Sequence, residues 1–208
     1  MTDSPPASID TLLSTGAYNP SIQAALEAHV ASQKSNASPY HYAANKTLLN
    51  HYQFFPTLSN PTTCADVLLL SLSHSPPDFL PLSHIADLSS PPAEAAGDLA
   101  ALLESCSFEA FWSRAEEEKE LLQSFPGFED RVRAGIAATM SKVYQSSPLP
   151  LTLLSLNLPA SSIASFASSS PVISSVTSTE VVFSPNEENQ PRPGRPKEVI
   201  GARCMADF

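Results

Sequence analysis

Glycine is scarce in this chain, and its six glycines stand apart from one another. Neither a GxGxxG nor a GxxxxGK pattern occurs, which argues against a loop that cradles phosphate groups. The three cysteines, Cys64, Cys106 and Cys204, are widely separated, and neither CxxC nor HExxH spacing is present. We therefore expect no metal, no cofactor and no catalytic centre, and we expect reduced thiols in a cytoplasmic protein.

Long apolar runs are also absent. The longest, Val67–Leu72, is interrupted by Ser71 and is far shorter than the roughly 20 residues that cross a bilayer. The first ten residues, MTDSPPASID, lack the basic and apolar stretches of a secretory signal, so we expect no membrane association.

Basic residues are few as well. The chain has 11 Lys and Arg residues against 21 Asp and Glu residues, and its formal net charge is −10. Such a surface repels phosphate backbones, so we expect no autonomous binding to DNA.

Proline is plentiful, with twenty residues, and predicts many short elements. Asn19-Pro20 and Asn60-Pro61 are typical helix starts, because Asn caps free backbone amides and Pro at the first helical position loses no hydrogen bond. Apolar residues at helical spacing predict further helices over residues 38–51, 78–88, 93–104, 107–122 and 128–145. The aromatic residues that we expect in the core are Tyr52, Phe54, Phe108, Phe111 and Trp112.

Helix pairs joined by short loops stack into a solenoid, in which each pair buries its apolar face against the next. We therefore expect a HEAT-like helical-repeat domain over residues 16–146, preceded by a flexible leader at residues 1–15. No strict sequence repeat occurs, so the solenoid is expected to be irregular.

The composition changes at Ser146-Ser147-Pro148, and a second domain is expected over residues 147–200. Its predicted order is helix, helix, strand, long loop and strand, which is the outline of a small winged-helix domain. These elements are expected at residues 149–156, 160–167, 179–183, 185–196 and 197–200. The fold class as a whole is therefore mainly α.

Two features could suggest chemistry, and neither is specific. Cys106 lies just before a predicted helix N-terminus, where a thiol pKa is lowered, but no partner marks it as a nucleophile, and Cys64 lies on an apolar helical face. A thiol-dependent enzyme is thus a distant alternative. The basic stretch Arg192–Lys197 resembles an AT-hook whose core is broken by Pro193, and we interpret it as the wing loop. A DNA-binding winged helix would need a basic recognition helix, whereas residues 160–167 contain no Lys or Arg.

Three segments, together with Tyr18-Asn19-Pro20 followed by Leu26 and Val30, carry a resemblance to a known family. The first contains Tyr40, Ala44-Asn45, Leu48-Leu49, Tyr52-Gln53-Phe54 and Pro56; the second contains Leu102-Leu103-Glu104, Cys106, Phe108 and Phe111-Trp112; the third contains Gly127-Phe128-Glu129-Asp130, Val132-Arg133 and Ile136. In order and spacing the chain resembles the subunit K family of eukaryotic translation initiation factor 3, a PCI-type family, over roughly residues 15–145. Residues 146–178 match it weakly, and residues 201–208 form a divergent tail.

The resemblance implies a helical-repeat domain followed by a winged helix, in agreement with the outline above. It also implies a non-catalytic scaffold subunit of that factor, in contact with its other subunits, above all subunit L, and through them with the small ribosomal subunit during mRNA recruitment. Winged-helix domains in such assemblies meet partly through sheet edges. The implied contact residues are Thr179, Glu180, Val181, Val182 and Phe183. The alternative with the same fold is a PCI-type subunit of the proteasome lid or signalosome.

Overall fold

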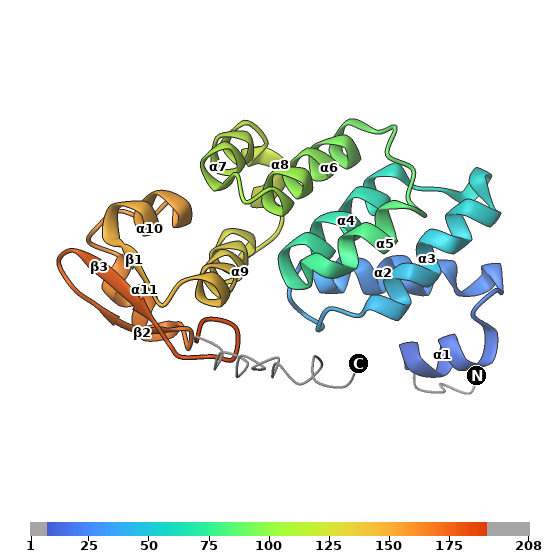
Figure 1. Ribbon diagram of the computed structural model, residues 1–208. Coiled ribbons are helices and arrows are strands. Elements are labelled where there is room, and N and C mark those ends of the chain that lie inside the picture. The colour runs from blue at the N-terminus through green and yellow to red at the C-terminus, as the bar shows by residue number, and fades with distance from the viewer. Residues whose placement is uncertain (1–7, 191–208) are drawn as a thin grey trace, which may run out of the picture.

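The computed structural model describes residues 8–190 and shows two parts that follow one another along the chain (Figure 1). The first part is helical. Its helices are α1 (Ile9–Gly16), η1 (Pro20–Ile22), α2 (Gln23–Lys34), α3 (Tyr42–Phe54), η2 (Pro56–Leu58), α4 (Pro61–His74), η3 (Pro76–Asp78), α5 (Phe79–Ser83), α6 (Pro91–Glu104), α7 (Phe108–Glu117), α8 (Lys119–Gln123) and α9 (Phe128–Val143). The second part consists of β1 (Ser146–Pro148), α10 (Leu149–Leu156), α11 (Ile163–Ser169), β2 (Ile173–Val176) and β3 (Glu180–Phe183).

Both Asn-Pro pairs start helices as the sequence predicts. The Asn19 side chain accepts a hydrogen bond from the Ser21 amide at 3.0 Å. The Asn60 side chain accepts from the amides of Thr62 and Thr63 at 3.1 and 3.4 Å. These bonds satisfy amides that have no partner within the helix, which fixes where the helices begin.

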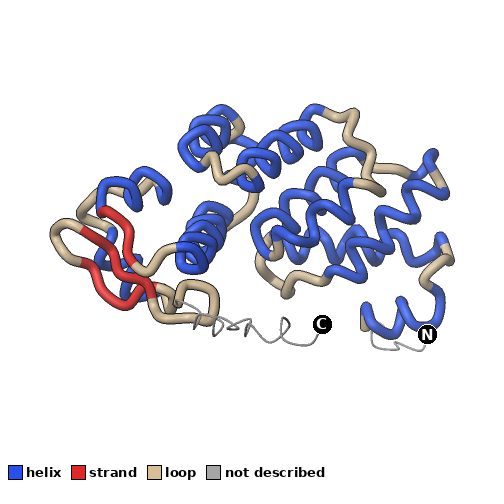
Figure 2. Tube along the Cα trace, viewed as in Figure 1, coloured by secondary structure: helices blue, strands red, loops and turns tan. Residues whose placement is uncertain are grey.

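Helix α4 is the centre of the helical part. It packs against α2, α3, α6 and α9, and it buries side chains on all sides, among them Leu68, Leu69 and Leu70. A helix that is apolar around its whole circumference has to be surrounded. The neighbouring helices therefore form layers around α4, with α1 to α5 at one end of the molecule and the sheet at the other (Figures 1 and 2).

Several boundaries differ from the prediction. Residues 9–15 belong to helix α1, whose Ile9, Leu12 and Leu13 pack against the core, so the leader predicted over residues 1–15 is wrong for this stretch. The helix predicted over 107–122 is divided into α7 and α8 by a break at Glu118. Ser107 precedes α7 as expected, but its side chain makes no capping hydrogen bond.

The aromatic core is largely as expected. Phe111, Trp112 and Tyr52 are buried, and Phe108 is partly buried. Phe54 is a correction, because it is 60% exposed, and its ring lies edge-on to the exposed Tyr18 ring with centroids 6.4 Å apart. It is the last residue of α3, whereas the buried residues of that helix end at Tyr52.

The second part is a winged helix with a three-stranded antiparallel sheet in the order β1-β3-β2. Val181 and Phe183 of β3 are buried on the side where α10 and α11 pack. The sequence predicted β3 but missed β1 and β2. The second strand predicted at Lys197–Ile200 and the wing loop predicted at Arg192–Lys197 lie outside the described residues.

Candidate functional site

The residues predicted to contact a partner lie in the middle of this sheet. Strand β3 pairs with β1 on one side and with β2 on the other, in the register Ser147↔Val181 and Val176↔Val181. Its backbone groups are therefore already used within the chain. The expectation that residues 179–183 offer a free sheet edge is wrong for the described sheet, because its edges are β1 and β2.

Three of the five predicted residues remain accessible through their side chains. Glu180 and Thr179 are exposed and Val182 is half-buried, whereas Val181 and Phe183 point into the core. The turn before β3 is fixed locally, since the Thr177 hydroxyl accepts from the Glu180 amide at 3.0 Å. The structure thus presents the turn between β2 and β3, at residues 177–179, and the outer face of β3 as a small, mainly polar surface.

Edge strand β2 is poorly suited to accept another strand. Its pairing with β3 shifts register between Ile173 and Ser175, as in a β-bulge. Bulges and short strands protect sheet edges from pairing with other chains. Besides the short edge strands, the exposed side chains of the turn at residues 177–179 and of the outer face of β3 are accessible on this domain.

The two parts of the molecule are joined at the C-terminal end of α10. The Trp112 indole donates a hydrogen bond to the Ser155 carbonyl at 2.8 Å, and the Arg133 Nε donates to the Leu156 carbonyl at 3.1 Å. The last carbonyls of a helix have no partner within it, so side chains of α7 and α9 complete the end of α10. Arg133 also lies over the Trp112 ring, 5.0 Å from its centroid, and pairs with Glu129 at 2.8 Å.

This junction was not foreseen from the sequence, although Trp112 and Arg133 both fall in family-like segments. Their position in two family-like segments was the only sequence signal for these residues, and it did not indicate that they contact α10. The arrangement holds the winged helix in a fixed position relative to α7 and α9. We interpret it as structural, because both side chains are used in contacts that connect α7 and α9 to α10.

The tyrosine and amide residues of the first family-like segment are also structural. The buried side chains of Gln33 and Asn45 exchange two hydrogen bonds of 2.9 and 3.1 Å. The Tyr52 hydroxyl donates to the Glu27 carboxylate at 2.8 Å, and burial raises the pKa of Tyr52 above its ordinary value. These contacts connect α3 to α2.

The two cysteines of the described residues differ in environment. Cys64 is buried, its thiol lies 3.7 Å from the Asp87 carbonyl, and burial raises its thiol pKa. Cys106 is exposed just after α6, with a left-handed backbone φ of 55°. Cys204 lies outside the described residues. Within residues 8–190 no group of three or more His, Cys, Asp or Glu side chains could hold a metal ion.

Alkylation with iodoacetamide should distinguish these thiols. In the native protein we expect Cys106 to react at least about tenfold faster than Cys64, because burial and a raised pKa both lower the accessible thiolate. Peptide mapping by mass spectrometry over a time course measures both rates. Denatured protein serves as the control, and the two rates should converge there. Equal rates in the native state would contradict the burial of Cys64.

The winged helix lacks the charge of a DNA-reading domain. Helix α11, which follows α10 as a recognition helix would, reads IASFASS and contains no Lys or Arg. In the part of the chain that the structure describes, no helix has both the length and the apolar character needed to cross a membrane.

Comparison with known proteins gives consistent matches. A model of the CSN8/PSMD8/EIF3K family matches residues 59–172, which is more than half of the chain. The chain is similar to eukaryotic translation initiation factor 3 subunit K of Homo sapiens and of Bos taurus, with 38% identity over 133 residues, and to that of Danio rerio, with 33% identity. Each match covers 62% of this chain and 60% of the relative. The chain thus spans about 60% of the length of the curated relatives that it matches.

Proposed function

Since the chain belongs to the CSN8/PSMD8/EIF3K family, we propose that it is a non-catalytic scaffold subunit of eukaryotic translation initiation factor 3. The observation that carries this proposal is the 38% identity to subunit K of that factor over 133 residues. The helical solenoid with its joined winged helix supports it, because such a framework offers extended surfaces to partners.

The proposed partners are the other subunits of the factor, with subunit L the nearest, and through the assembled factor the small ribosomal subunit. The proposed place of action is the cytoplasm, where the complex would support mRNA recruitment. For the contact with subunit L we propose the turn between β2 and β3 and the outer face of β3, with Thr179, Glu180 and Val182 as contact residues. Their exposure and their position at the outer end of the molecule support this choice.

A tagged pull-down from a eukaryotic cytosolic extract tests the function. At moderate salt we expect the other subunits of initiation factor 3 to be recovered, with subunit L the most resistant to rising salt, as read by mass spectrometry. Recovery of proteasome-lid or signalosome subunits instead would keep the fold and replace the function with the alternative of the same architecture. Recovery of neither set would refute both.

A pair of charge-reversal variants tests the location of the contact. Glu180→Arg changes the outer face of β3, and Glu187→Arg makes the same change at an exposed residue beyond the sheet. We expect Glu180→Arg to release subunit L at lower salt and Glu187→Arg to behave like the parent, because reversed charge at an interface is repulsive. Equal behaviour of the two variants would remove the contact from β3 while leaving the proposed function intact.

A further inference from the structure

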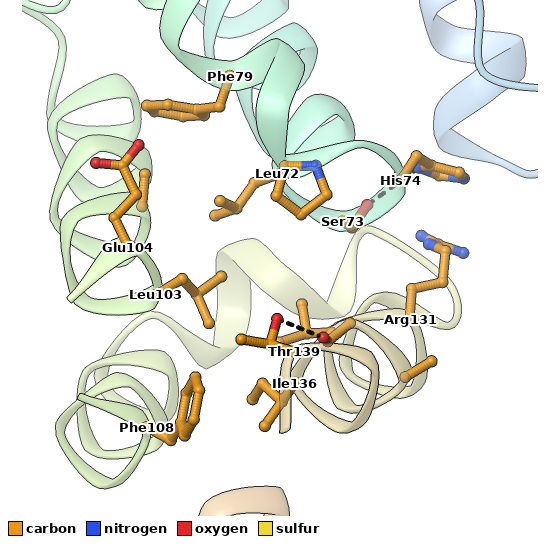
Figure 3. A pocket seen from close by; sticks show the side chains of 15 residues that line it. Leu72, Ser73, His74, Phe79, Leu103, Glu104, Phe108, Arg131, Ile136 and Thr139 are labelled. Carbon is orange, nitrogen blue, oxygen red and sulfur yellow. Dashed lines mark hydrogen bonds between the residues drawn. The ribbon is translucent and has the colours of Figure 1, made fainter. Parts of the chain in front are cut away.

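A cavity of about 420 Å³ lies between α4, α5, α6, α7 and α9. Its wall is mainly apolar, and Figure 3 shows Leu72, Phe79, Leu103, Phe108 and Ile136 around its space. This volume is within the range of about 300–1,000 Å³ that is typical of binding pockets. The size and the apolar wall suit a large apolar group rather than bulk water.

One wall of the cavity carries an incompletely paired cation. The Arg131 Nη1 donates to the Pro126 carbonyl at 2.9 Å and lies 3.4 Å from the Asn36 side-chain oxygen. Its Nε and Nη2 are buried and have no hydrogen-bond partner among the described residues. The neighbouring carboxylate of Asp130 pairs with Arg133 instead, at 3.0 Å. Buried guanidinium N–H groups without partners are unfavourable, so this site favours a carboxylate from outside.

The imidazole of His74 lies beside this guanidinium (Figure 3). Burial, and then the charge of Arg131, lower the pKa of His74, so the ring is held in its neutral form beside the cation. The ring stacks on Tyr40 with centroids 5.5 Å apart, and its Nδ1 contacts the Leu70 carbonyl at 3.1 Å. Because Nε and Nη2 of Arg131 are buried, a carboxylate reaches them only if neighbouring side chains move. The carboxylate of Glu104 lies on the opposite wall, away from Arg131 (Figure 3).

We propose that this cavity binds a segment of a partner protein that inserts an aromatic or large aliphatic side chain beside an aspartate or glutamate. The apolar side chain fills the space between Leu103, Phe108 and Ile136, and the acidic side chain pairs with Arg131. Buried anchors next to charge-assisted hydrogen bonds are how protein interfaces concentrate their affinity. The choice of a protein partner rests on the proposed function, because a scaffold subunit acts by holding segments of other proteins.

The chain offers a matched pair of variants that fill the cavity or leave it open. A Cβ added at Gly135 of α9, which lines the cavity, meets nothing within 4 Å. A Cβ added at Gly97 of α6, which does not line it, also meets nothing within 4 Å. Gly135→Leu and Gly97→Leu therefore make the same change in open helical positions, and only the first occupies the cavity. Thr139→Phe, from the next turn of α9, is a second blocking variant.

Selection from a displayed library of random peptides, with the whole purified chain as bait, provides the first test. We expect the selected peptides to share an aromatic or large aliphatic residue next to Asp or Glu. We expect Gly135→Leu and Thr139→Phe to weaken their binding by at least about tenfold in fluorescence polarisation, whereas Gly97→Leu binds like the parent. Circular dichroism melts establish that each variant is folded. Peptides without the acidic residue, no selected peptides, or equal binding by folded blocking variants would each overturn the proposal.

The role of Arg131 is tested with one selected peptide and its neutral counterpart, in which Glu is replaced by Gln or Asp by Asn. Arg131→Gln should weaken binding of the acidic peptide by about tenfold and binding of the neutral peptide much less. The reason is that hydrogen bonds to charged groups are stronger than those between neutral groups. An equal loss for both peptides would show that Arg131 does not recognise the carboxylate. Binding of phenylacetate, tested as a small carboxylate probe, in the absence of any peptide binding would reassign the cavity to small molecules and overturn the proposal.

These tests are independent of the pull-down. Failure of the chain to recover initiation factor subunits would refute the proposed function even if acidic peptides bind the cavity. Failure of the peptide experiments would refute the docking site and leave the pull-down result unaffected.

Discussion

Truncation of Trp112 to alanine is expected to lower the free energy of unfolding by about 3–5 kcal/mol. The indole is 8% exposed, contacts the Phe111 ring edge-on at 5.1 Å and lies under Arg133. Its removal leaves a cavity at the junction of the two parts. It also leaves the Ser155 carbonyl at the end of α10 without its donor. The cost is therefore the sum of lost packing and one unmade hydrogen bond.

Urea denaturation followed by far-UV circular dichroism measures this loss. Tryptophan fluorescence is unsuitable, because the chain contains a single tryptophan. Trp112→Phe serves as the control, since it keeps much of the aromatic packing and removes the indole donor. We expect it to cost about 1–2 kcal/mol. An unfolding curve for Trp112→Ala equal to that of the parent would refute the burial and the role of the junction.

The Trp112 variant also reports on coupling between the two parts. Trp112 and Arg133 together bridge α7 and α9 to the last turn of α10. If this junction makes the molecule one cooperative unit, the Trp112→Ala curve should stay a single transition at lower urea. Two transitions would instead show that the winged helix unfolds separately once the indole is absent.

The parts of the fold that follow from the sequence are those with strong local signals. The Asn-Pro helix starts and the helix at Leu149–Leu156 are present as predicted, because capping and proline geometry act within a few residues. Strand β1, with the sequence SSP, contains no β-branched residue, and strand β2, with ISSV, has its two β-branched residues separated by two serines. They are strands because β3 lies between them, and such pairing is decided by the tertiary structure.

The candidate sites could be predicted less well than the helices, because they depend on packing between distant parts of the chain. The exposure of Phe54 depends on which helix faces other parts of the chain cover, and apolar spacing alone does not reveal this. The cavity beside Arg131 is formed by five helices between residues 61 and 143, so no local pattern marks it. The unpaired guanidinium is visible only once the neighbouring carboxylate is seen to pair elsewhere.

The residues that carry the family resemblance acquire a physical explanation from the structure. Asn45 is fully buried and pairs with Gln33, and the Gln33 oxygen also accepts from the His41 amide at 2.9 Å. This last bond fixes the residue that caps α3. A polar pair inside the core is tolerated only when its groups find partners, so this segment specifies the register between α2 and α3.

Replacement of Asn45 by leucine is accordingly expected to cost about 2–3 kcal/mol of unfolding free energy. Leucine is similar in size but cannot bond to Gln33, whose buried amide nitrogen then has no partner. Urea denaturation by circular dichroism measures the loss. The single variant Gln33→Met should cost a similar amount, since it leaves both the Asn45 amide and the His41 amide without their acceptor.

The double variant Gln33→Met/Asn45→Leu separates the two explanations for such a loss. If the cost of each single variant comes from stranding a buried amide, the double variant strands fewer groups and should be more stable than the sum of the two losses predicts. The His41 amide remains without its acceptor, so recovery to the parental stability is not expected. A double variant whose loss equals the sum of the single losses would show that the two side chains act independently, and the pair could then not be what sets the register of α3 on α2.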